Sequence, residues 1–268
     1  MDDNIKKTPL YDEHVDLGAK IVDYYSFKMP LQYDSIISEH KSVRNSAGLF
    51  DISHMGEIVI DGKGATELVQ KLITNDVSNL PDFKAVYSPI CDEEGGTIDD
   101  IVVYKYNPEK YMLVVNCSTT KRDLKWIDKQ KAEDTNVKNV SDQISLLAVQ
   151  GPKSFKLMKK IFGEQITKLK FFGFDYFDFE GTKHLIAQSG WSKQGGYEIY
   201  VENTKSGLEL YDYLFEVGKE FNVKPGCPNL IERIESALLS YGNDMDNNDN
   251  PFECGFDKFI NLESEVNF

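Results

Sequence analysis

The sequence is short of cysteine, histidine and long apolar runs, and each shortage excludes a class of protein. Its four cysteines lie far apart without a C-x-x-C pair, and its four histidines are equally scattered, so no metal site is expected. No apolar run approaches the roughly 18 residues that a membrane-spanning helix needs. The first residues, Met-Asp-Asp-Asn-Ile-Lys-Lys, lack the basic start and apolar stretch of a signal peptide. We therefore expect a cytoplasmic protein with no membrane partner.

Basic residues are also in the minority. Lys and Arg number 30 against 44 Asp and Glu, which gives a net charge of −14. Proteins that bind nucleic acids cluster Lys and Arg against the phosphates, so a nucleic-acid partner is not expected. The 41% hydrophobic and 28% charged content is ordinary for a globular protein. A chain of 268 residues suffices for one large domain or about two ordinary ones.

Three widespread functional motifs are missing. The sequence contains no G-x-x-x-x-G-K-[ST], no G-x-G-x-x-G after an expected strand and no G-x-S-x-G. These motifs hold nucleotide phosphates or present a nucleophilic serine. The common nucleotide-binding and serine-hydrolase classes are therefore disfavoured.

Hydrophobic periodicity predicts an α+β chain. The first half reads as a β-rich region with helices packed on one side, rather than as a doubly wound sheet. The expected helices are 35–47, with Ser35 as N-cap, then 65–73, 121–131, 153–161, 206–219 and 229–241. The expected strands are 58–60, 85–91, 97–104, 111–116, 145–150, 175–188 and 196–202. The run 243–250 is rich in turn formers and reads as a polar loop.

The most informative stretch is Ser189–Tyr200, a glycine-broken loop that carries Trp191 and leads into a strand. Period-2 alternation places Glu198 and Tyr200 on one face of that strand. A carboxylate beside aromatic side chains suits a flat heterocycle with adjacent N–H donors, such as a pterin or a purine. The alternative is a half-buried strand with an outward glutamate.

A pair of acids, Asp99 and Asp100, opens another apolar strand after a Gly-Gly turn. Asp100 shares a face with Val102 and Asp99 shares one with Ile101, so one acid must point where its neighbours are buried. Such a carboxylate could stabilise a cation or transfer a proton. Alternatively, both acids finish the turn and lie in water. His54 precedes a strand and is interpreted as structural rather than catalytic.

Several longer motifs resemble a known superfamily. Over about residues 8–145 the chain resembles the aminomethyltransferase, or T-protein, of the glycine cleavage system, through Thr8–Lys20, Gly48–Gly56, Leu72–Val77 and Gly95–Tyr104. The second half looks similar to dimethylsulfoniopropionate (DMSP) demethylase, a relative in the same folate-dependent superfamily, through Ala148–Phe155, Phe171–His184, the Trp191 loop, Pro228–Glu235 and Pro251–Gly255.

The resemblance implies a T-protein-type folate-binding fold with ferredoxin-like antiparallel sheets and packed helices. It implies two interleaved subdomains, 1–54 plus 145–268 and 55–144. Members of both families continue into a C-terminal β-barrel domain. We expect that domain to be absent here, because the sequence stops at Glu265–Phe268 directly after apparent core sequence.

The resemblance also implies the ligand and the residues that bind it. Both families use tetrahydrofolate as the acceptor of a one-carbon unit. Asp100 matches the catalytic aspartate near folate N5, and Glu198 matches the glutamate that grips the pterin edge. Trp191 falls where T-proteins usually carry Tyr. The remaining expected ligand-binding positions are Met55, Tyr87, Asn116, Tyr200 and Arg233.

The sequence thus predicts a tetrahydrofolate-dependent one-carbon transferase. In the family, the first half of the chain forms most of the part of the cavity that receives the one-carbon donor, and here that half resembles T-protein. The resemblance favours aminomethyl transfer from the lipoyl arm of H-protein to tetrahydrofolate, with release of ammonia. One alternative is DMSP demethylation, in which the methyl group of a small sulfonium donor moves to tetrahydrofolate. A second alternative is a non-catalytic folate-binding fragment. In either transfer, positive charge moves near N5, so a pre-oriented carboxylate such as Asp100 lowers the barrier.

Overall fold

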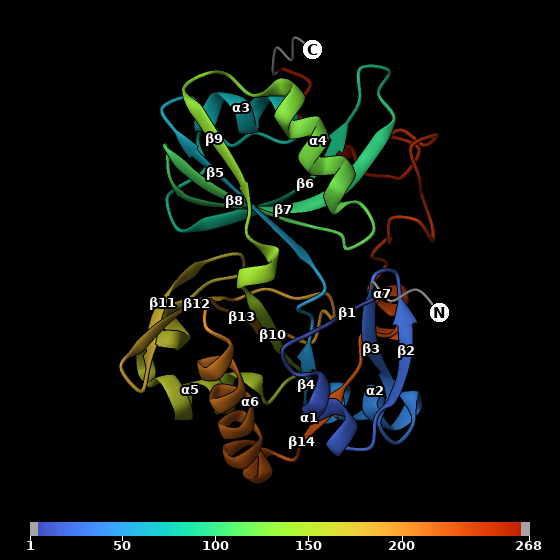
Figure 1. The fold of residues 1–268 in the computed structure, drawn as a ribbon, viewed down its shortest axis with the longest axis vertical. Helices are drawn as coiled ribbons and strands as arrows, with labels where there is room; N and C mark the ends of the chain where they lie inside the picture. The colour runs from blue at the N-terminus through green and yellow to red at the C-terminus, as the bar shows by residue number, and fades with distance from the viewer. Residues whose placement is uncertain (1–4, 264–268) are drawn as a thin grey trace. The chain divides into compact units, whose positions relative to one another are not determined.

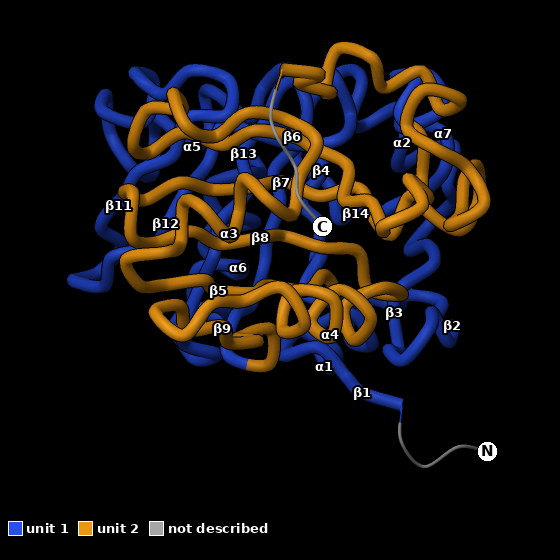
Figure 2. Tube along the Cα trace, turned by 90° about the horizontal axis from the view of Figure 1, so that it is seen from above, with its two compact units in different colours: residues 1–54, 143–238 blue, residues 55–142, 239–268 orange. Residues whose placement is uncertain are grey.

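The structure is a computed structural model that describes residues 5–263. Within that range the chain forms two compact units, which Figure 2 colours blue and orange. Unit 1 contains residues 5–54 and 143–238, and unit 2 contains 55–142 and 239–263. The chain therefore leaves unit 1 after His54, builds most of unit 2 and returns at Gln143.

The stretch 239–263 belongs with unit 2, whereas the expected division placed 145–268 with residues 1–54. The side chains of Tyr241, Met245 and Phe256 are buried together and pack against Tyr87 of unit 2. Burial of these large apolar groups accounts for the assignment. The expected chain end, Glu265–Phe268, lies outside the described residues.

Unit 1 is built on a six-stranded sheet of order β11-β12-β13-β10-β4-β14 (Figure 1). The β14–β4 pair is parallel and the other pairs are antiparallel. The strands are β4 Ala47–Asp51, β10 Ser145–Gln150, β11 Phe174–Phe179, β12 Thr182–Ala187, β13 Gly196–Val201 and β14 Val223–Gly226. A smaller sheet of order β1-β3-β2 comprises β1 Lys6–Lys7, β2 Lys20–Tyr24 and β3 Phe27–Gln32.

Helices cover one face of the six-stranded sheet. The helices of unit 1 are α1 Tyr11–Asp16, α2 Ile36–Asn45, α5 Ser154–Phe162, α6 Thr204–Gly218 and α7 Leu230–Glu235. Leu147 and Ile199 of the sheet pack against Leu157 of α5 and Leu214 of α6 in a buried core. Because side chains alternate along a strand, the residues between these core positions lie on the opposite face.

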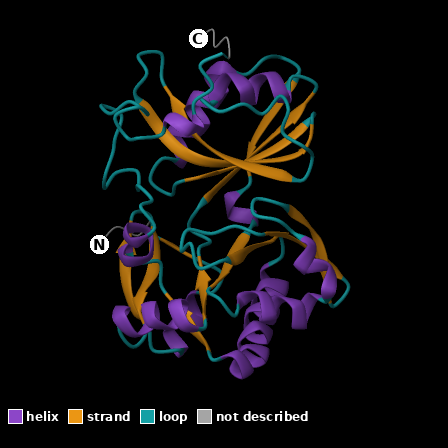
Figure 3. Cartoon of the chain, turned by 180° about the vertical axis from the view of Figure 1, so that it is seen from behind, coloured by secondary structure: helices purple, strands orange, loops and turns teal. Residues whose placement is uncertain are grey.

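Unit 2 is built on a five-stranded antiparallel sheet of order β6-β7-β8-β5-β9. Its strands are β5 Gly56–Gly62, β6 Lys84–Cys91, β7 Thr97–Asn107, β8 Lys110–Val115 and β9 Thr135–Asn139. Two helices, α3 Ala65–Leu72 and α4 Thr120–Gln130, cover one face (Figure 3). Ile58, Ile101 and Val103 of the sheet are buried with Leu68 of α3 and Ile127 of α4.

Most of the expected elements are present. Helix α2 begins after Ser35, whose side chain accepts a hydrogen bond from the Ser38 backbone N–H, as predicted for an N-cap. The α+β class is confirmed. Among residues 5–263, no helix combines the length and apolarity that a bilayer crossing requires.

The helix predicted for 229–241 is too long, because α7 ends at Glu235. Ala237 adopts a left-handed conformation with φ 53°. The Leu238 N–H donates to the Arg233 carbonyl and the Ala237 N–H donates to the Ile234 carbonyl, which is the Schellman pattern of a helix C-terminus. Glycine usually occupies the left-handed position of this motif, so alanine there gave no stop signal.

Candidate functional site

Three expected site residues of unit 2 lie together beside the start of β7. The Tyr87 hydroxyl donates a hydrogen bond to Asp100 Oδ2 at 3.1 Å, and Asn116 Nδ2 donates to Asp100 Oδ1 at 3.1 Å. Tyr87 pairs with Val102 across the β6–β7 ladder, so Tyr87 and Asp100 share one face of the sheet. This face is the one that α3 and α4 leave uncovered, since Ile101 and Val103 point toward the helices.

Met55 lies just before β5, where Gly56 pairs with Val115 of β8. This register places Met55 in the row of Asn116, at the same end of the sheet as Asp100. Met55 is half-buried. The structure therefore brings the four expected residues of unit 2 to one end of one sheet.

The two neighbouring acids have different surroundings. Asp99 points toward the helix side of the sheet and is fully buried, whereas Asp100 is half-buried on the other side. The Asp99 carboxylate accepts hydrogen bonds from the Asn116 backbone N–H, from Asn116 Nδ2 and from Thr119 Oγ1. The interpretation in which both acids finish the turn and lie in water is therefore wrong.

The surroundings of Asp100 bring its titration into the physiological range. Burial in the protein, and then the negative charge of Asp99, raise the pKa of Asp100 to about 7, while hydrogen bonds from Tyr87 and Asn116 act in the opposite direction. Burial and the Asp100 charge raise the pKa of Tyr87 above its usual value, so Tyr87 stays a protonated donor. A carboxyl group of this kind can stabilise a nearby cation when ionised and can exchange a proton near neutral pH.

His54, unlike Asp100, does not titrate near neutral pH. It is buried, and burial lowers the pKa of its imidazole to about 4, so the ring is neutral at neutral pH. Its ring packs edge-on against Tyr24 with the centroids 5.4 Å apart. These contacts favour the structural interpretation of His54.

In unit 1 the expected alternation on β13 is present. Ile199 faces the core under α5 and α6, so Glu198 and Tyr200 lie on the opposite face of the sheet. Glu198 is half-buried, and Ser189 Oγ donates to its Oε2 at 2.5 Å. Tyr200 is buried.

The Trp191 loop lies over the same face. Through Ala148, the strand register places Phe50 on the Glu198 side of the sheet. The Trp191 ring packs edge-on against Phe50, with centroids 5.1 Å apart and an interplanar angle of 76°. A half-buried carboxylate and an indole are thus held on one sheet face.

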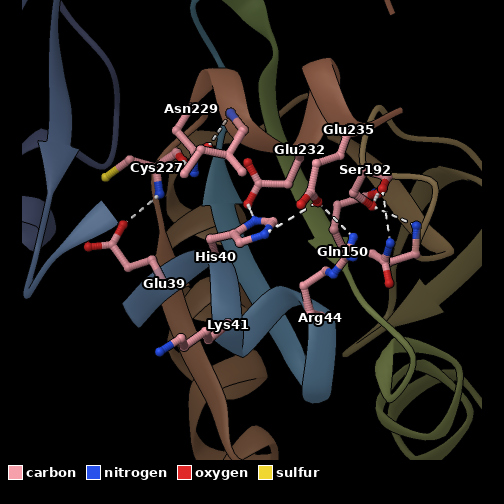
Figure 4. Close-up of polar contacts among 12 residues, drawn as sticks. Glu39, His40, Lys41, Arg44, Gln150, Ser192, Cys227, Asn229, Glu232 and Glu235 are labelled. Atoms are coloured by element: carbon pink, nitrogen blue, oxygen red, sulfur yellow. Dashed lines mark hydrogen bonds and ion pairs between the residues drawn. The ribbon is translucent and has the colours of Figure 1, made fainter. Parts of the chain in front are cut away.

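Gln150 fixes this loop, a role that no sequence pattern indicates. Gln150 Nε2 donates to the Ser189 carbonyl at 3.0 Å, and Ser192 Oγ donates to Gln150 Oε1 at 2.8 Å (Figure 4). Gly190 has φ +142°, and a Cβ there would lie 2.1 Å from the Gln150 amide. Glycine is therefore required where the loop crosses Gln150.

We expect Gly190→Ala to destabilise unit 1 by about 1–3 kcal/mol and to loosen the Trp191 loop, because the new methyl group would displace Gln150. Urea unfolding and tryptophan fluorescence measure the two effects. Gly181→Ala is the matched control, since Gly181 also has a positive φ, +81°, but an added Cβ meets no atom within 4 Å. Equal losses in both variants would contradict the role of Gln150.

Arg233 lies on α7, which polar side-chain contacts join to α2 (Figure 4). His40 Nδ1 lies 3.0 Å from Glu232 Oε1, and Arg44 Nη1 donates to Glu235 Oε2 at 2.7 Å. Arg233 Nη1 donates to the Leu238 carbonyl at 3.2 Å, in the turn that ends α7. The contacts with His40 and Arg44 were not expected from the sequence, because they join residues about 190 positions apart.

Comparison with known proteins assigns the chain to a family. Residues 10–264 match the family described as GCVT N-terminal domain. The chain belongs to this family. Among curated GCVT relatives, the aminomethyltransferase of Thermoanaerobacter pseudethanolicus is 42% identical over 266 residues, 97% of this chain and 72% of the relative. The aminomethyltransferase of Thermotoga maritima is 38% identical over 265 residues, again 97% and 72%.

Solved structures agree with this GCVT assignment. The glycine cleavage system aminomethyltransferase T of Bartonella henselae matches with a TM-score of 0.86 and 26% identity, covering 96% of this chain and 70% of that one. Heterotetrameric sarcosine oxidase from Corynebacterium sp. U-96 matches with a TM-score of 0.56 and 12% identity, covering 82% and 97%, and so shares the fold. The superfamily inferred from the sequence motifs is confirmed, and the curated matches extend through both halves of the chain.

Proposed function

We propose that this chain transfers an aminomethyl carbon from the lipoyl arm of an H-protein to tetrahydrofolate, with release of ammonia. The observation that carries the proposal is the match, over 97% of the chain, to proteins named aminomethyltransferase. The acid that the sequence selected, Asp100, has a pKa of about 7 and is held by Tyr87 and Asn116, which supports the same reaction.

The residues present fit a reduced pterin by the chemistry of their side chains. Glu198 offers a carboxylate, which can accept hydrogen bonds from the adjacent N–H groups of a pterin edge. Trp191 provides an aromatic ring on the same sheet face, and the buried Tyr200 lies on that face as well. We assign the pterin edge to Glu198, the stacking contact to Trp191, and supporting ligand contacts to Met55, Tyr200 and, for the folate tail, Arg233.

Tetrahydrofolate supplies a nucleophilic nitrogen, N5, that accepts the one-carbon unit. The task of Asp100 is to hold a negative charge where positive charge develops during the transfer, without having to reorient. Tyr87 and Asn116 fix both carboxyl oxygens of Asp100 and so reduce its freedom to rotate. Because the pKa of Asp100 lies near neutrality, the same carboxyl can also hold a proton between reaction stages.

The oxidation level of the transferred carbon tests the proposal. An aminomethyl carbon is at the level of formaldehyde and yields 5,10-methylenetetrahydrofolate, whereas a sulfonium methyl yields 5-methyltetrahydrofolate. The protein is mixed with tetrahydrofolate and either aminomethylated H-protein or DMSP, and the folate products are identified by mass spectrometry. We expect the methylene product from H-protein alone.

Formation of 5-methyltetrahydrofolate with methylthiopropionate would replace the proposal by sulfonium demethylation. If tetrahydrofolate binds but neither donor reacts, the chain is a folate-binding protein without transferase activity. Asp100→Asn serves as the control for enzyme-dependent product, because it removes the charge on which either transfer relies.

A further inference from the structure

Two buried acids of unit 2, Asp99 and Asp123, do not contact the ligand in the proposed reaction. Asp99 lies near the start of β7 and Asp123 lies in the first turn of α4, and both side chains are fully buried. Burying an ionised carboxylate is costly unless it is hydrogen-bonded or paired, so two adjacent buried acids require an explanation.

The two acids differ in their hydrogen bonds. Asp99 accepts from Asn116 N at 3.0 Å, from Asn116 Nδ2 at 2.8 Å and from Thr119 Oγ1 at 2.8 Å. Burial raises the pKa of Asp99, and these hydrogen bonds act in the opposite direction because they stabilise the ionised form. The Asp123 side chain interacts with the Asp99 carboxyl and with the Thr119 hydroxyl, but within residues 5–263 neither of its carboxyl oxygens makes a hydrogen bond of ordinary geometry. Burial, and then the charge of Asp99, raise the pKa of Asp123 to about 9. Asp123 therefore keeps its proton at neutral pH.

Asn116 joins this pair of acids to the proposed catalytic group. Its side-chain nitrogen donates to Asp99 Oδ1 at 2.8 Å, to Asp100 Oδ1 at 3.1 Å and to the Asp100 carbonyl at 3.1 Å. The orientation of the Asp100 carboxyl therefore depends on an amide that Asp99 holds in place. The backbone N–H of Asn116 is held by Asp99 as well, which anchors the turn leading into α4.

We propose that Asp99 and Asp123 form a buried acid pair that shares one proton and, through Asn116, positions Asp100 and keeps a single negative charge beside it. This inference rests on the proposed function, in which Asp100 is the acting carboxyl. Asp99 and Asp123 are positioning residues, because they reach the reaction only through Asn116 and Asp100.

The other ionisable groups around the acid pair do not supply the negative charge that Asp99 places beside Asp100. Tyr87 faces Asp100 from β6 and stays protonated, and burial also raises the pKa of Cys254, which lies in the segment that packs against Tyr87. Arg122 of α4 lowers the pKa of Asp123, but this effect is smaller than those of burial and Asp99. Its guanidinium stacks over the Tyr241 ring, 4.8 Å from the centroid. Asp99 is therefore the main negative charge acting on Asp100.

The acid pair predicts different effects of two conservative substitutions on the pKa of Asp100. Asp99→Asn removes the charge next to Asp100, while burial keeps Asp123 protonated, so the pKa of Asp100 should fall by about one unit. Asp123→Asn replaces the shared O–H by an amide N–H and leaves Asp99 ionised, so the pKa of Asp100 should stay near its wild-type value. A purely structural role for these acids would not separate the two variants in this way.

The experiment is a carboxyl NMR titration of the whole chain labelled with 13C-aspartate, from about pH 5 to pH 9, without donor or folate. Loss of a resonance in Asp100→Asn and in Asp123→Asn assigns the two signals. We expect Asp100 to titrate near neutrality and Asp123 to remain protonated through that midpoint. Asp128→Asn, which removes an exposed acid from the same helix, is the matched control and should leave both signals in place.

An Asp100 midpoint that does not move in Asp99→Asn would overturn the proposal, as would an ionised Asp123 at neutral pH. The titration needs no turnover, so it separates this inference from the proposed function. If the midpoints follow the prediction but no donor reacts, the acid pair stands and the proposed reaction fails.

Discussion

Asp100→Asn should lower the single-turnover rate of aminomethyl transfer by about 10²–10³-fold, the usual loss for removing one pre-oriented electrostatic group. The amide has the same size and can still accept the hydrogen bond from Tyr87, but it can neither carry a negative charge nor take up a proton. Tetrahydrofolate affinity, measured by calorimetry, should change little, because the interaction is needed mainly in the transition state.

The pH dependence gives a second test of the same residue. With a pKa of about 7, Asp100 is protonated below neutrality, so the wild-type rate should rise with pH through that value and then level off. Glu93→Gln changes an exposed acid in the turn before β7 and should leave both rate and profile unchanged. An unaltered rate in Asp100→Asn would remove this residue from the mechanism.

Glu198→Gln should weaken tetrahydrofolate binding by about 10–100-fold, the range expected when a hydrogen-bonded charge is replaced by a neutral amide. An amide oxygen still accepts hydrogen bonds, but the NH2 group would meet the N–H donors of the pterin edge. Because the contact is made in ground and transition states alike, KM should rise while kcat stays close to the wild-type value.

Glu202→Gln is the control for this second effect, since Glu202 is an exposed acid just beyond the end of the same strand. The quenching of tryptophan fluorescence by tetrahydrofolate provides an independent measure of binding for both variants. Equal affinities for wild type and Glu198→Gln would exclude the pterin contact.

The parts of the fold that the sequence predicted are those with strong local periodicity. The strand alternation of β13 placed Glu198 and Tyr200 on one face, and that of β7 placed Asp99 and Asp100 on opposite faces. The N-cap at Ser35 was recognisable because its hydroxyl satisfies a local backbone N–H. In each case the deciding interaction lies within a few residues along the chain.

Long-range contacts and unusual backbone conformations could not be predicted. Gln150 was one polar residue at the end of an apolar strand until its hydrogen bonds to Ser189 and Ser192 were seen. The early end of α7 depends on Ala237 in a conformation that alanine rarely adopts. The association of 239–263 with unit 2 rests on aromatic residues in an irregular segment without periodicity.

The central claim is that this chain transfers carbon to tetrahydrofolate from an aminomethyl donor. A single turnover with H-protein carrying a 13C-labelled aminomethyl group tests it most directly, with NMR following the label and an ammonia assay following the nitrogen. We predict that the label appears as the methylene carbon of the folate product and that one ammonia is released per carbon, at a rate that Asp100→Asn reduces. A label that stays on H-protein while tetrahydrofolate is bound would contradict the account.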